Sequence, residues 1–181
     1  MTADTGDFWV FGYGSLVWRP GFDFIETQVA TLHGWHRALC VYSHVHRGTP
    51  EQPGMVLGLD RGGSCRGVAF LVAPERKDAT IAYLRAREQV TMVYAETWVE
   101  VRLAQGRRVR ALTYTVDRSH QQYAPRLPDE ELIRLVRRGV GQSGANPDYV
   151  RQTHAHLTRL GIRDGRLEKL VRMLGDPPLD V

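Results

Sequence analysis

Long apolar runs are scarce in this sequence, and so are the marks of an export signal. No stretch of its 181 residues approaches the ~20 consecutive apolar residues that a membrane-spanning helix needs. The first residues, MTADTGDFWV, have neither the basic region nor the apolar stretch of a secretion signal. We therefore expect a soluble, cytoplasmic protein with no membrane partner.

Cysteine is scarce as well, and no group of residues has the spacing of a metal site. Cys40 and Cys65 lack CxxC spacing, so they predict neither a zinc site nor a disulfide framework. We expect both thiols to be reduced and structural. Two pairs of histidines also lack a suitable third ligand nearby, so we expect no metal. These pairs are His44 with His46 and His154 with His156.

The sequence also lacks the signature of an RNA-binding or helix-turn-helix protein, although its net charge is +4. The arginines are scattered over segments of different types, among them Arg37, Arg47, Arg66, Arg85, Arg110 and Arg151. Two interpretations of this charge remain open, a solvated basic surface and a basic pocket for a small anionic substrate. We expect no nucleic-acid partner.

What the sequence does contain is sufficient for one folded domain. Its 181 residues, of which 43% are hydrophobic and 24% charged, allow one well-buried core and are too few for two comfortable ones. No repeat, low-complexity tract or linker divides the chain. We predict a single domain over residues 1–181.

The first two thirds of the chain are predicted to consist mainly of strands. Aromatic and β-branched residues mark residues 8–14, 24–43, 55–60, 66–73, 97–104 and 109–117. Residues 24–43 predict one or two strands. The last two segments, 97–104 and 109–117, flank QGRR, a loop typical of a hairpin. Apolar residues at helical spacing in residues 75–91 predict one inserted helix.

The last third of the chain predicts three helices. Residues 127–140 have acidic residues in the first turn and arginines near the end, which suits the helix dipole. A second helix begins with Asn146 as N-cap and Pro147 in the first helical position. The third, residues 166–174, stops before Gly175. The predicted fold is therefore α+β, a closed or strongly curved sheet with helices packed around it.

The turn after the first strand, GYGSL at residues 12–16, resembles two known motifs and fits neither. A dinucleotide-binding loop needs a third glycine where Val17 stands, and Pro20 prevents the helix that should follow. A nucleophile elbow, G-x-S-x-G, fails because Tyr13 and Val17 occupy its glycine positions. We predict that Ser15 is not a nucleophile and that the turn presents backbone amides to one end of a substrate.

Glu88 is the carboxylate with a candidate role in chemistry. It lies late in the inserted helix, where the helix dipole disfavours negative charge and tends to raise the pKa toward that of a useful base. The alternative is a surface glutamate that pairs with Arg85 or Arg87. Helical periodicity by itself favours the ion pair.

Five blocks of sequence, in order, resemble the ChaC-like γ-glutamylcyclotransferases over residues 8 to about 174. The blocks are FGYGSLVW, HRGTPEQPG, YLRAREQV, DRSHQQYA and GQSGANPDYV. Their specific signals are the Y-G-S-L turn after a strand, the R-E pair that ends a central helix, and HRG followed shortly by PG. The resemblance implies a small mixed β-barrel of about six strands with flanking helices.

The resemblance also implies an activity, that of a lyase that cleaves glutathione without a cofactor. The γ-glutamyl group would cyclise to 5-oxoproline and release cysteinylglycine. By resemblance, the turn that grips the γ-glutamyl group consists of Tyr13, Gly14, Ser15 and Leu16. The resemblance makes Glu88 the general base.

Four further residues fall at positions that the resemblance makes candidates for substrate binding. Arg47, in HRGTP, could pair with a substrate carboxylate, and a surface ion pair is the equal alternative. Tyr123 and Tyr149 are candidates to line the pocket, with core packing as the alternative for each. Some relatives have two glycines and a tyrosine soon after the R-E pair, whereas this chain has QVTMVY, which leaves Tyr94 at the tyrosine position. This departure affects the shape of the pocket floor more than the chemistry.

Two other functions stay open beside glutathione cleavage. One is a cyclotransferase that acts on other γ-glutamyl amino acids or on γ-glutamylamines. The other is a binding module that captures a γ-glutamyl or other anionic ligand without turning it over. Glu88 discriminates between enzyme and module, because a pure binder gains nothing from an acid at the pocket.

Overall fold

The computed structural model describes residues 6–175, which fall into two compact units. Unit 1 contains the chain up to Ala38 together with Gly58–Gln121, and unit 2 contains Leu39–Leu57 together with the chain from Gln122 onward. The chain passes between the units within two long strands, β2 (Glu26–Ser43) and β3 (Gly54–Val72). The single domain predicted from sequence stays a prediction.

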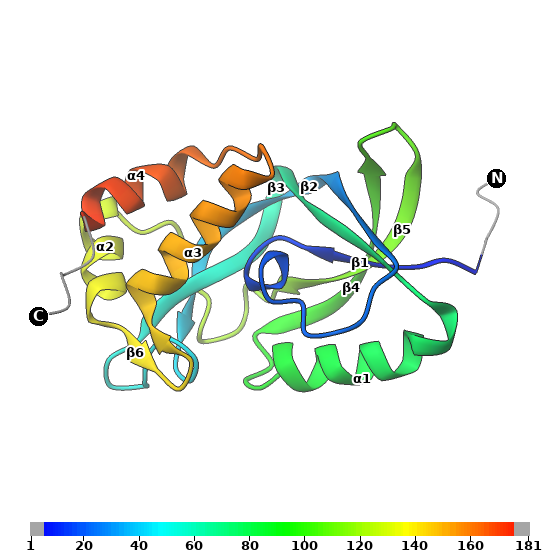
Figure 1. Cartoon of the computed structure of the whole chain (residues 1–181). Coiled ribbons are helices and arrows are strands. Elements are labelled where there is room, and N and C mark those ends of the chain that lie inside the picture. The colour runs from blue at the N-terminus through cyan, green and yellow to red at the C-terminus, as the bar shows by residue number, and fades with distance from the viewer. Residues whose placement is uncertain (1–5, 176–181) are drawn as a thin grey trace, which may run out of the picture. The chain divides into compact units, whose positions relative to one another are not determined.

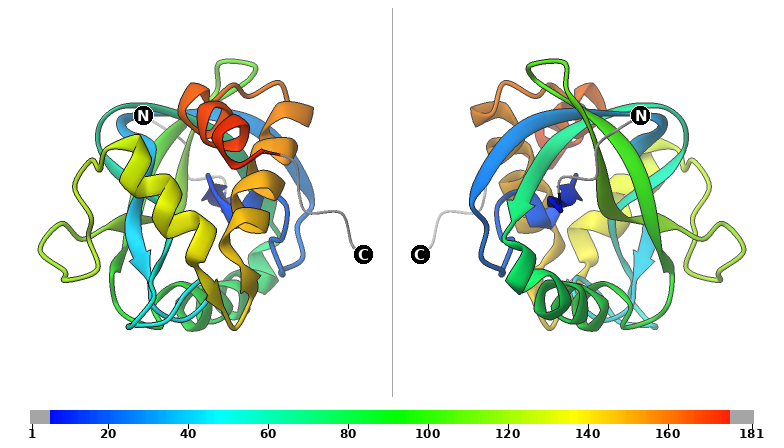
Figure 2. Two further views of the ribbon diagram at one scale, coloured as in Figure 1. Left: turned by 90° about the vertical axis from the view of Figure 1, so that its left-hand side faces the viewer. Right: turned by 90° about the vertical axis from the view of Figure 1, so that its right-hand side faces the viewer.

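Unit 1 is built around a closed five-stranded barrel with strand order β1-β3-β2-β4-β5 (Figure 1). Its other strands are β1 (Phe8–Gly12), β4 (Tyr94–Leu103) and β5 (Arg108–Val116). The barrel is mixed, because β1 runs antiparallel to β3 and parallel to β5. All five residues of β1 are buried, as expected for an apolar strand with neighbours on both sides. The right-hand view of Figure 2 shows how strongly the barrel strands curve.

These observations confirm the α+β class and the mixed barrel, but the expected count of about six strands was slightly too high. Residues 55–60 and 66–73 were predicted as two strands, whereas residues 55–60 and 66–72 lie in the single strand β3 and Ala73 follows its end. Between them, Gly62 and Gly63 adopt positive φ values of 98° and 69°, which glycine tolerates without a steric penalty. The strand therefore continues through a segment that the sequence pattern marks as a break.

The inserted helix of unit 1 is α1 (Lys77–Glu88), which follows a short 3-10 turn, η2 (Pro74–Arg76). Leu84 of α1 is fully buried in an apolar cluster with the barrel residues Phe70 and Leu112. This contact fixes the helix against the barrel (Figure 1). The predicted β4–β5 hairpin is also present, and Gly106 in its turn has a φ of 86°.

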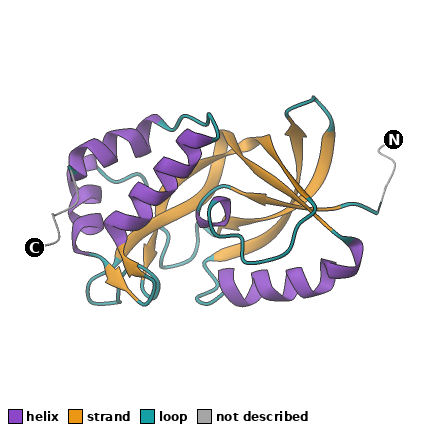
Figure 3. Cartoon of the chain, viewed as in Figure 1, coloured by secondary structure: helices purple, strands orange, loops and turns teal. Residues whose placement is uncertain are grey.

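Unit 2 contains the three predicted C-terminal helices, which pack against one another (Figures 2 and 3). They are α2 (Asp129–Arg138), α3 (Asn146–Arg159) and α4 (Gly165–Leu174), and a short hairpin of β6 (Val140–Gly141) and β7 (Gly144–Ala145) precedes α3. The buried residues of α2, Leu132, Ile133 and Val136, form one helical face. Gly175 caps the end of α4 with a φ of 70°, as its position in the sequence predicts.

The expected N-cap role of Asn146 is wrong, because Ala145 occupies that position and Asn146 is the first helical residue. The Asn146 side chain instead accepts a hydrogen bond from the Met55 amide at 2.7 Å and donates one to the Met55 carbonyl at 2.8 Å. It is completely buried. Asn146 therefore joins α3 to the start of β3 within unit 2.

Candidate functional site

Glu88 is the last residue of α1, and the local sequence explains why the helix ends there. Thr80 and Leu84 form the buried side of the helix, and the Gln89 amide closes its last turn by donating to the Arg85 carbonyl. The chain then leaves the helix through residues 89–93. This geometry leaves the Glu88 side chain 17% exposed rather than free in solvent.

The burial of Glu88 changes its acidity. Burial raises the pKa of the Glu88 carboxyl above its ordinary value, and the neighbouring Arg87 charge opposes that rise in part. The sequence argument attributed a raised pKa to the helix dipole, whereas here the cause is desolvation. A carboxyl group with a raised pKa suits transfer of a proton near neutral pH.

The GYGSL turn begins at the last residue of β1 and leads into a single 3-10 turn, η1 (Ser15–Val17). Its hydrogen bonds run from the Val17 amide to the Gly14 carbonyl and from the Trp18 and Arg19 amides to the Ser15 carbonyl. The amides of Ser15 and Leu16 stand at the start of η1, where a helical turn does not use its own N–H groups. The turn can therefore offer these donors to an oxygen atom.

The buried side chain of Leu16 and the lack of a side chain at Gly12 hold the turn against the barrel. The Leu16 side chain is 6% exposed and lies in the same apolar cluster as Phe70, so only the backbone of Leu16 can serve a substrate. A Cβ atom at Gly12 would lie 3.0 Å from the Leu16 Cβ and 3.2 Å from the Phe70 ring. The absence of a side chain at Gly12 thus lets the turn fold closely over the end of β1.

Arg87 links the turn to the carboxyl group of Glu88. Its Nη2 donates to the Ser15 hydroxyl at 3.0 Å, and its Nε lies 3.3 Å from the Glu88 Oε1. Residues more than seventy positions apart in the chain are thereby brought to one guanidinium group, within unit 1. The ion pair of Glu88 with Arg87, offered from sequence as the alternative to a catalytic role, forms at a largely buried position.

The tyrosines predicted for the site in unit 1 have different surroundings. Tyr13 is 6% exposed, and its hydroxyl donates to the Tyr114 carbonyl at 2.9 Å, so its side chain supports the turn. Tyr94 begins β4, is partly buried and packs against the apolar cluster that contains Leu84. Its carbonyl accepts a hydrogen bond from the Gln89 side chain at 3.4 Å, which ties β4 to the residue after Glu88.

A second carboxylate, Glu96 of β4, lies in this part of unit 1 and was missed by sequence reasoning. Arg85 donates to both of its oxygens, at 2.7 and 2.9 Å, and these bonds lower the pKa of Glu96. The Tyr114 hydroxyl also donates to Glu96, at 3.4 Å. The pKa of Tyr114 is raised by burial first, and by the charges of Glu96 and Glu88. Strand pairing creates this group, and no local spacing in the sequence indicates it.

Arg47 and Tyr149 come together within unit 2. The Arg47 guanidinium donates to the Ala145 carbonyl at 3.1 Å and lies 5.4 Å from the centre of the Tyr149 ring. Arg47 is 7% exposed and Tyr149 6%, and the Tyr149 hydroxyl accepts a hydrogen bond from the Leu57 amide at 3.0 Å. These contacts match the core-packing alternative for Tyr149, and substrate binding by either residue stays a prediction.

Tyr123, the remaining predicted residue, lies beside the end of β2 in unit 2. It pairs with Val41 in an isolated antiparallel bridge, and the Ala124 amide donates to the Cys40 carbonyl at 2.8 Å. The Tyr123 side chain is partly buried. Its place in a short strand-like segment fixes its backbone, and its role toward substrate stays a prediction.

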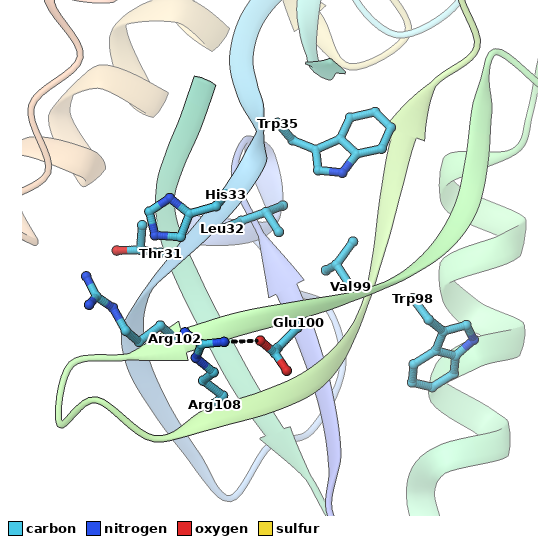
Figure 4. A pocket seen from close by; sticks show the side chains of 9 residues that line it. All are labelled: Thr31, Leu32, His33, Trp35, Trp98, Val99, Glu100, Arg102 and Arg108. Carbon is cyan, nitrogen blue, oxygen red and sulfur yellow. Dashed lines mark hydrogen bonds and ion pairs between the residues drawn. The ribbon is translucent and has the colours of Figure 1, made fainter. Parts of the chain in front are cut away.

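A separate hollow of about 530 Å³ opens on unit 1 where the pairing of β2 and β4 ends (Figure 4). Two tryptophans, Trp35 and Trp98, stand at it, and Arg108 pairs with Glu100 at 3.0 Å within it. Its remaining lining residues are Thr31, Leu32, His33, Val99 and Arg102. The residues that line this hollow include none of the predicted site residues.

Among residues 6–175, no group of three or more histidine, cysteine, aspartate or glutamate side chains is arranged to hold a metal ion. Over the same range, every helix is too short or too polar to cross a lipid bilayer.

Comparison with known families gives the same answer as the five sequence blocks. A family model described as ChaC-like protein matches residues 8–176. The chain belongs to the ChaC-like family. The match covers the turn, Glu88 and the three C-terminal helices, so the ChaC-like assignment extends to both units.

Individual relatives within the family have related descriptions. The glutathione-specific gamma-glutamylcyclotransferase of Escherichia coli (strain K12) is 36% identical over 168 residues, which cover 93% of this chain and 73% of that protein. The human glutathione-specific gamma-glutamylcyclotransferase 1 is 32% identical over 152 residues, which cover 82% of this chain and 68% of that protein.

Solved structures agree on the fold. A yeast gamma-glutamyl cyclotransferase specific to glutathione superposes with a TM-score of 0.86 at 22% identity, covering 93% of this chain and 95% of the yeast chain. A second gamma-glutamyl cyclotransferase superposes with a TM-score of 0.58 at 16% identity, covering 97% and 90%. The barrel with flanking helices is thus the fold of this group of proteins.

Proposed function

We propose that this ChaC-like chain is a lyase, a γ-glutamylcyclotransferase that cleaves glutathione to 5-oxoproline and cysteinylglycine. The observation that carries the proposal is the shared site of Glu88 and Ser15. A largely buried carboxyl group with a raised pKa and the GYGSL turn contact the same Arg87 guanidinium. The names of the E. coli and human relatives support glutathione as the substrate.

The first step assigned to Glu88 is removal of a proton. The α-amine of the γ-glutamyl group is mostly an ammonium ion at neutral pH, since such groups titrate near pH ~8. It must lose a proton before its nitrogen can attack. Glu88, ionised and within reach of the bound amine, accepts that proton.

Ring closure then needs no nucleophile from the protein. The α-nitrogen attacks the γ-carbonyl carbon, a carbon–nitrogen bond forms, and the amide bond to cysteine breaks. Glu88 gives its proton to the departing nitrogen, which leaves as an amine. The ring nitrogen then loses its second proton through Glu88 to that amine, so the products are a neutral lactam and an ammonium group and Glu88 is ionised again. Because both reacting groups belong to one molecule, a bound conformation that brings them together supplies much of the rate. The proposed reaction therefore requires no nucleophilic triad.

The GYGSL turn is assigned to the charge that develops during attack. The γ-carbonyl oxygen becomes an oxyanion, and preorganised donors at such an oxygen are among the largest contributions to catalysis. The amides of Ser15 and Leu16 and the Ser15 hydroxyl are the donors proposed here. Tyr13 and Gly14 shape the turn, and Tyr94, Tyr123, Tyr149 and Arg47 remain proposed substrate contacts.

The test is to incubate the purified full chain with glutathione and measure 5-oxoproline and cysteinylglycine. Glu88→Gln should keep the fold and lower kcat on the order of 10²–10⁴-fold, because the amide cannot accept the proton. Glu100→Gln, an exposed isosteric change on β4, is the matched control and should retain full activity. Undiminished turnover by the Glu88 variant would refute the role of this residue.

Substrate and location complete the proposal. The proposed partner is a small molecule. Comparing the turnover rates of glutathione, γ-glutamylalanine and a γ-glutamylamine separates glutathione specificity from a broader γ-glutamyl activity. Calorimetric binding of glutathione without product after hours would instead identify a binding module. We place the enzyme in the cytoplasm, which fractionation of cells that express the full-length protein tests directly.

A further inference from the structure

We propose that Arg87 is a positioning residue of this site, which holds the Ser15 hydroxyl as a donor toward substrate and holds the Glu88 carboxyl beside it. The inference rests on the proposed function, which assigns roles to Ser15 and Glu88 and none to Arg87. The guanidinium group of Arg87 contacts five other groups of the protein. These are the Ser15 hydroxyl, the Arg19 and Pro20 carbonyls, the Tyr83 hydroxyl and the Glu88 carboxylate.

The contact with Ser15 has a direction that chemistry fixes. A guanidinium group has five N–H donors and no acceptor, so the Ser15 Oγ must accept the hydrogen bond from Arg87 Nη2. The hydroxyl proton of Ser15 is then available to a different partner. Donation to Oγ by a cation also polarises the O–H bond, which strengthens it as a donor to an anionic oxygen. Arg87 thus sets Ser15 as a donor.

Arg87 is itself held in place by groups outside the site. Its Nη1 donates to the carbonyls of Arg19 and Pro20 and, at 3.1 Å, to the Tyr83 hydroxyl one helical turn earlier. Tyr83 stands over Gly21, whose φ is 75° and whose missing Cβ would lie 2.0 Å from the Tyr83 hydroxyl oxygen. The chain after the turn is therefore shaped to accept this ring, and Arg87 is 18% exposed as a result.

The charge of Arg87 acts on Glu88 together with the groups of the facing strands. From β5, Tyr114 faces this region with a hydroxyl whose pKa is raised, so it stays neutral in the working range. From β4, Glu96 is ionised but bound by both nitrogens of the Arg85 fork. Arg87 is thus the cation that contacts Glu88 directly, and it opposes the rise that burial produces in the pKa of this carboxyl.

Two substitutions separate the charge of Arg87 from its shape. Arg87→Met removes both, so the acid limb of kcat/KM against pH should move to higher pH and kcat should fall about 10²-fold. Arg87→Lys keeps a charge but cannot reach all five partners. It should leave the acid limb near that of the wild type and still lower kcat, with KM little changed. Arg76→Met, which removes an exposed cation at the start of α1, is the matched control and should change neither.

A measurement without substrate keeps this inference distinct from the proposed function. The ¹³C resonance of the Glu88 carboxyl, assigned by its loss in Glu88→Gln, is titrated in the wild type and in Arg87→Met, both checked for fold by circular dichroism. We expect the midpoint to rise in the variant. An unchanged midpoint, or a folded Arg87→Met with wild-type kcat and pH profile, overturns the inference. If the wild type turns over no γ-glutamyl compound, the proposed function fails, and the titration alone decides on Arg87.

Discussion

At the scale of single residues, the different surroundings of Glu88 and Glu96 shift the pKa values of these two carboxyl groups of unit 1 in opposite directions. Burial raises the pKa of Glu88, whereas hydrogen bonds from Arg85 lower the pKa of Glu96. One group is thus prepared to exchange a proton, and the other keeps a fixed negative charge. Pairs of carboxyl groups whose pKa values are driven apart are a common basis for acid–base assignments. Here the assignment favours Glu88 as the base.

The raised pKa of Glu88 predicts a gain in stability when its charge is removed. In the unfolded chain Glu88 titrates near pH ~4.3, and in the folded chain it titrates higher. Between these two pKa values the folded state binds more protons, so the free energy of unfolding falls as pH rises and then stays constant. We expect Glu88→Gln to be more stable than the wild type at pH ~7 and no more stable below pH ~4, where the wild-type carboxyl is protonated in both states.

Urea denaturation at the two pH values measures this effect. Glu100→Gln, with its carboxyl on the surface, should show no such gain. A Glu88→Gln protein that is less stable than the wild type at both pH values would contradict the prediction. It would mean that contacts of the carboxyl, and not its desolvation, dominate the free energy of unfolding.

At the scale of elements, local sequence signals predicted the helices and the hairpin well. They did not predict the pairing of strands that lie far apart in the sequence. The last turn of α1 and the stop at Gly175 follow from spacing and glycine chemistry that act within a few residues. The strand β3 continues through Gly62 as a member of the barrel between β1 and β2, an arrangement that local spacing does not indicate. The same holds for the site. The turn, Glu88 and a possible Glu88–Arg87 ion pair were predicted, whereas the contact of Arg87 with Ser15 was not.

The loop between α1 and β4, residues 89–93, contains most of the QVTMVY segment that the resemblance marked as a departure from some relatives. Met92 has a φ of 62°, the only positive φ of a non-glycine residue in the part of the chain that is described, and its side chain is 60% exposed. Left-handed geometry costs a residue with a Cβ roughly 1–2 kcal/mol. We therefore expect Met92→Gly to raise the free energy of unfolding by on the order of 1 kcal/mol, after the entropy that glycine adds to the unfolded chain.

Chemical denaturation of Met92→Gly beside Met92→Ala tests this prediction. Alanine removes the long side chain and keeps the strained backbone, so it should give no gain. Equal stability of the two variants would show that the Met92 side chain, rather than its backbone geometry, sets the stability of the loop.

At the scale of the whole molecule, Asn146 provides a test of the predicted single domain. It lies in unit 2, whereas all four tryptophans, Trp9, Trp18, Trp35 and Trp98, lie in unit 1. Asn146→Ala leaves the buried amide and carbonyl of Met55 without these hydrogen bonds, which should lower the free energy of unfolding by about 2 kcal/mol or more. In a single cooperative domain, tryptophan fluorescence should report this loss although the change lies in unit 2.

Thermal unfolding followed by fluorescence and by far-UV circular dichroism makes the comparison. The dichroism signal is dominated by the helices of unit 2, and both midpoints should fall together in Asn146→Ala. Gln142→Ala, an exposed change in the same unit, is the control and should leave both midpoints in place. A fluorescence midpoint that stays at its wild-type value would mean that the units melt separately.

The two cysteines place one thiol in each unit, Cys40 in unit 2 at 4% exposure and Cys65 in unit 1 at 2%. Thiol–disulfide exchange requires that a thiolate be reached by its reaction partner. Both thiols are therefore shielded from such a partner while the protein is folded. Alkylation of Cys40 or Cys65 would therefore report local unfolding of the unit that contains it.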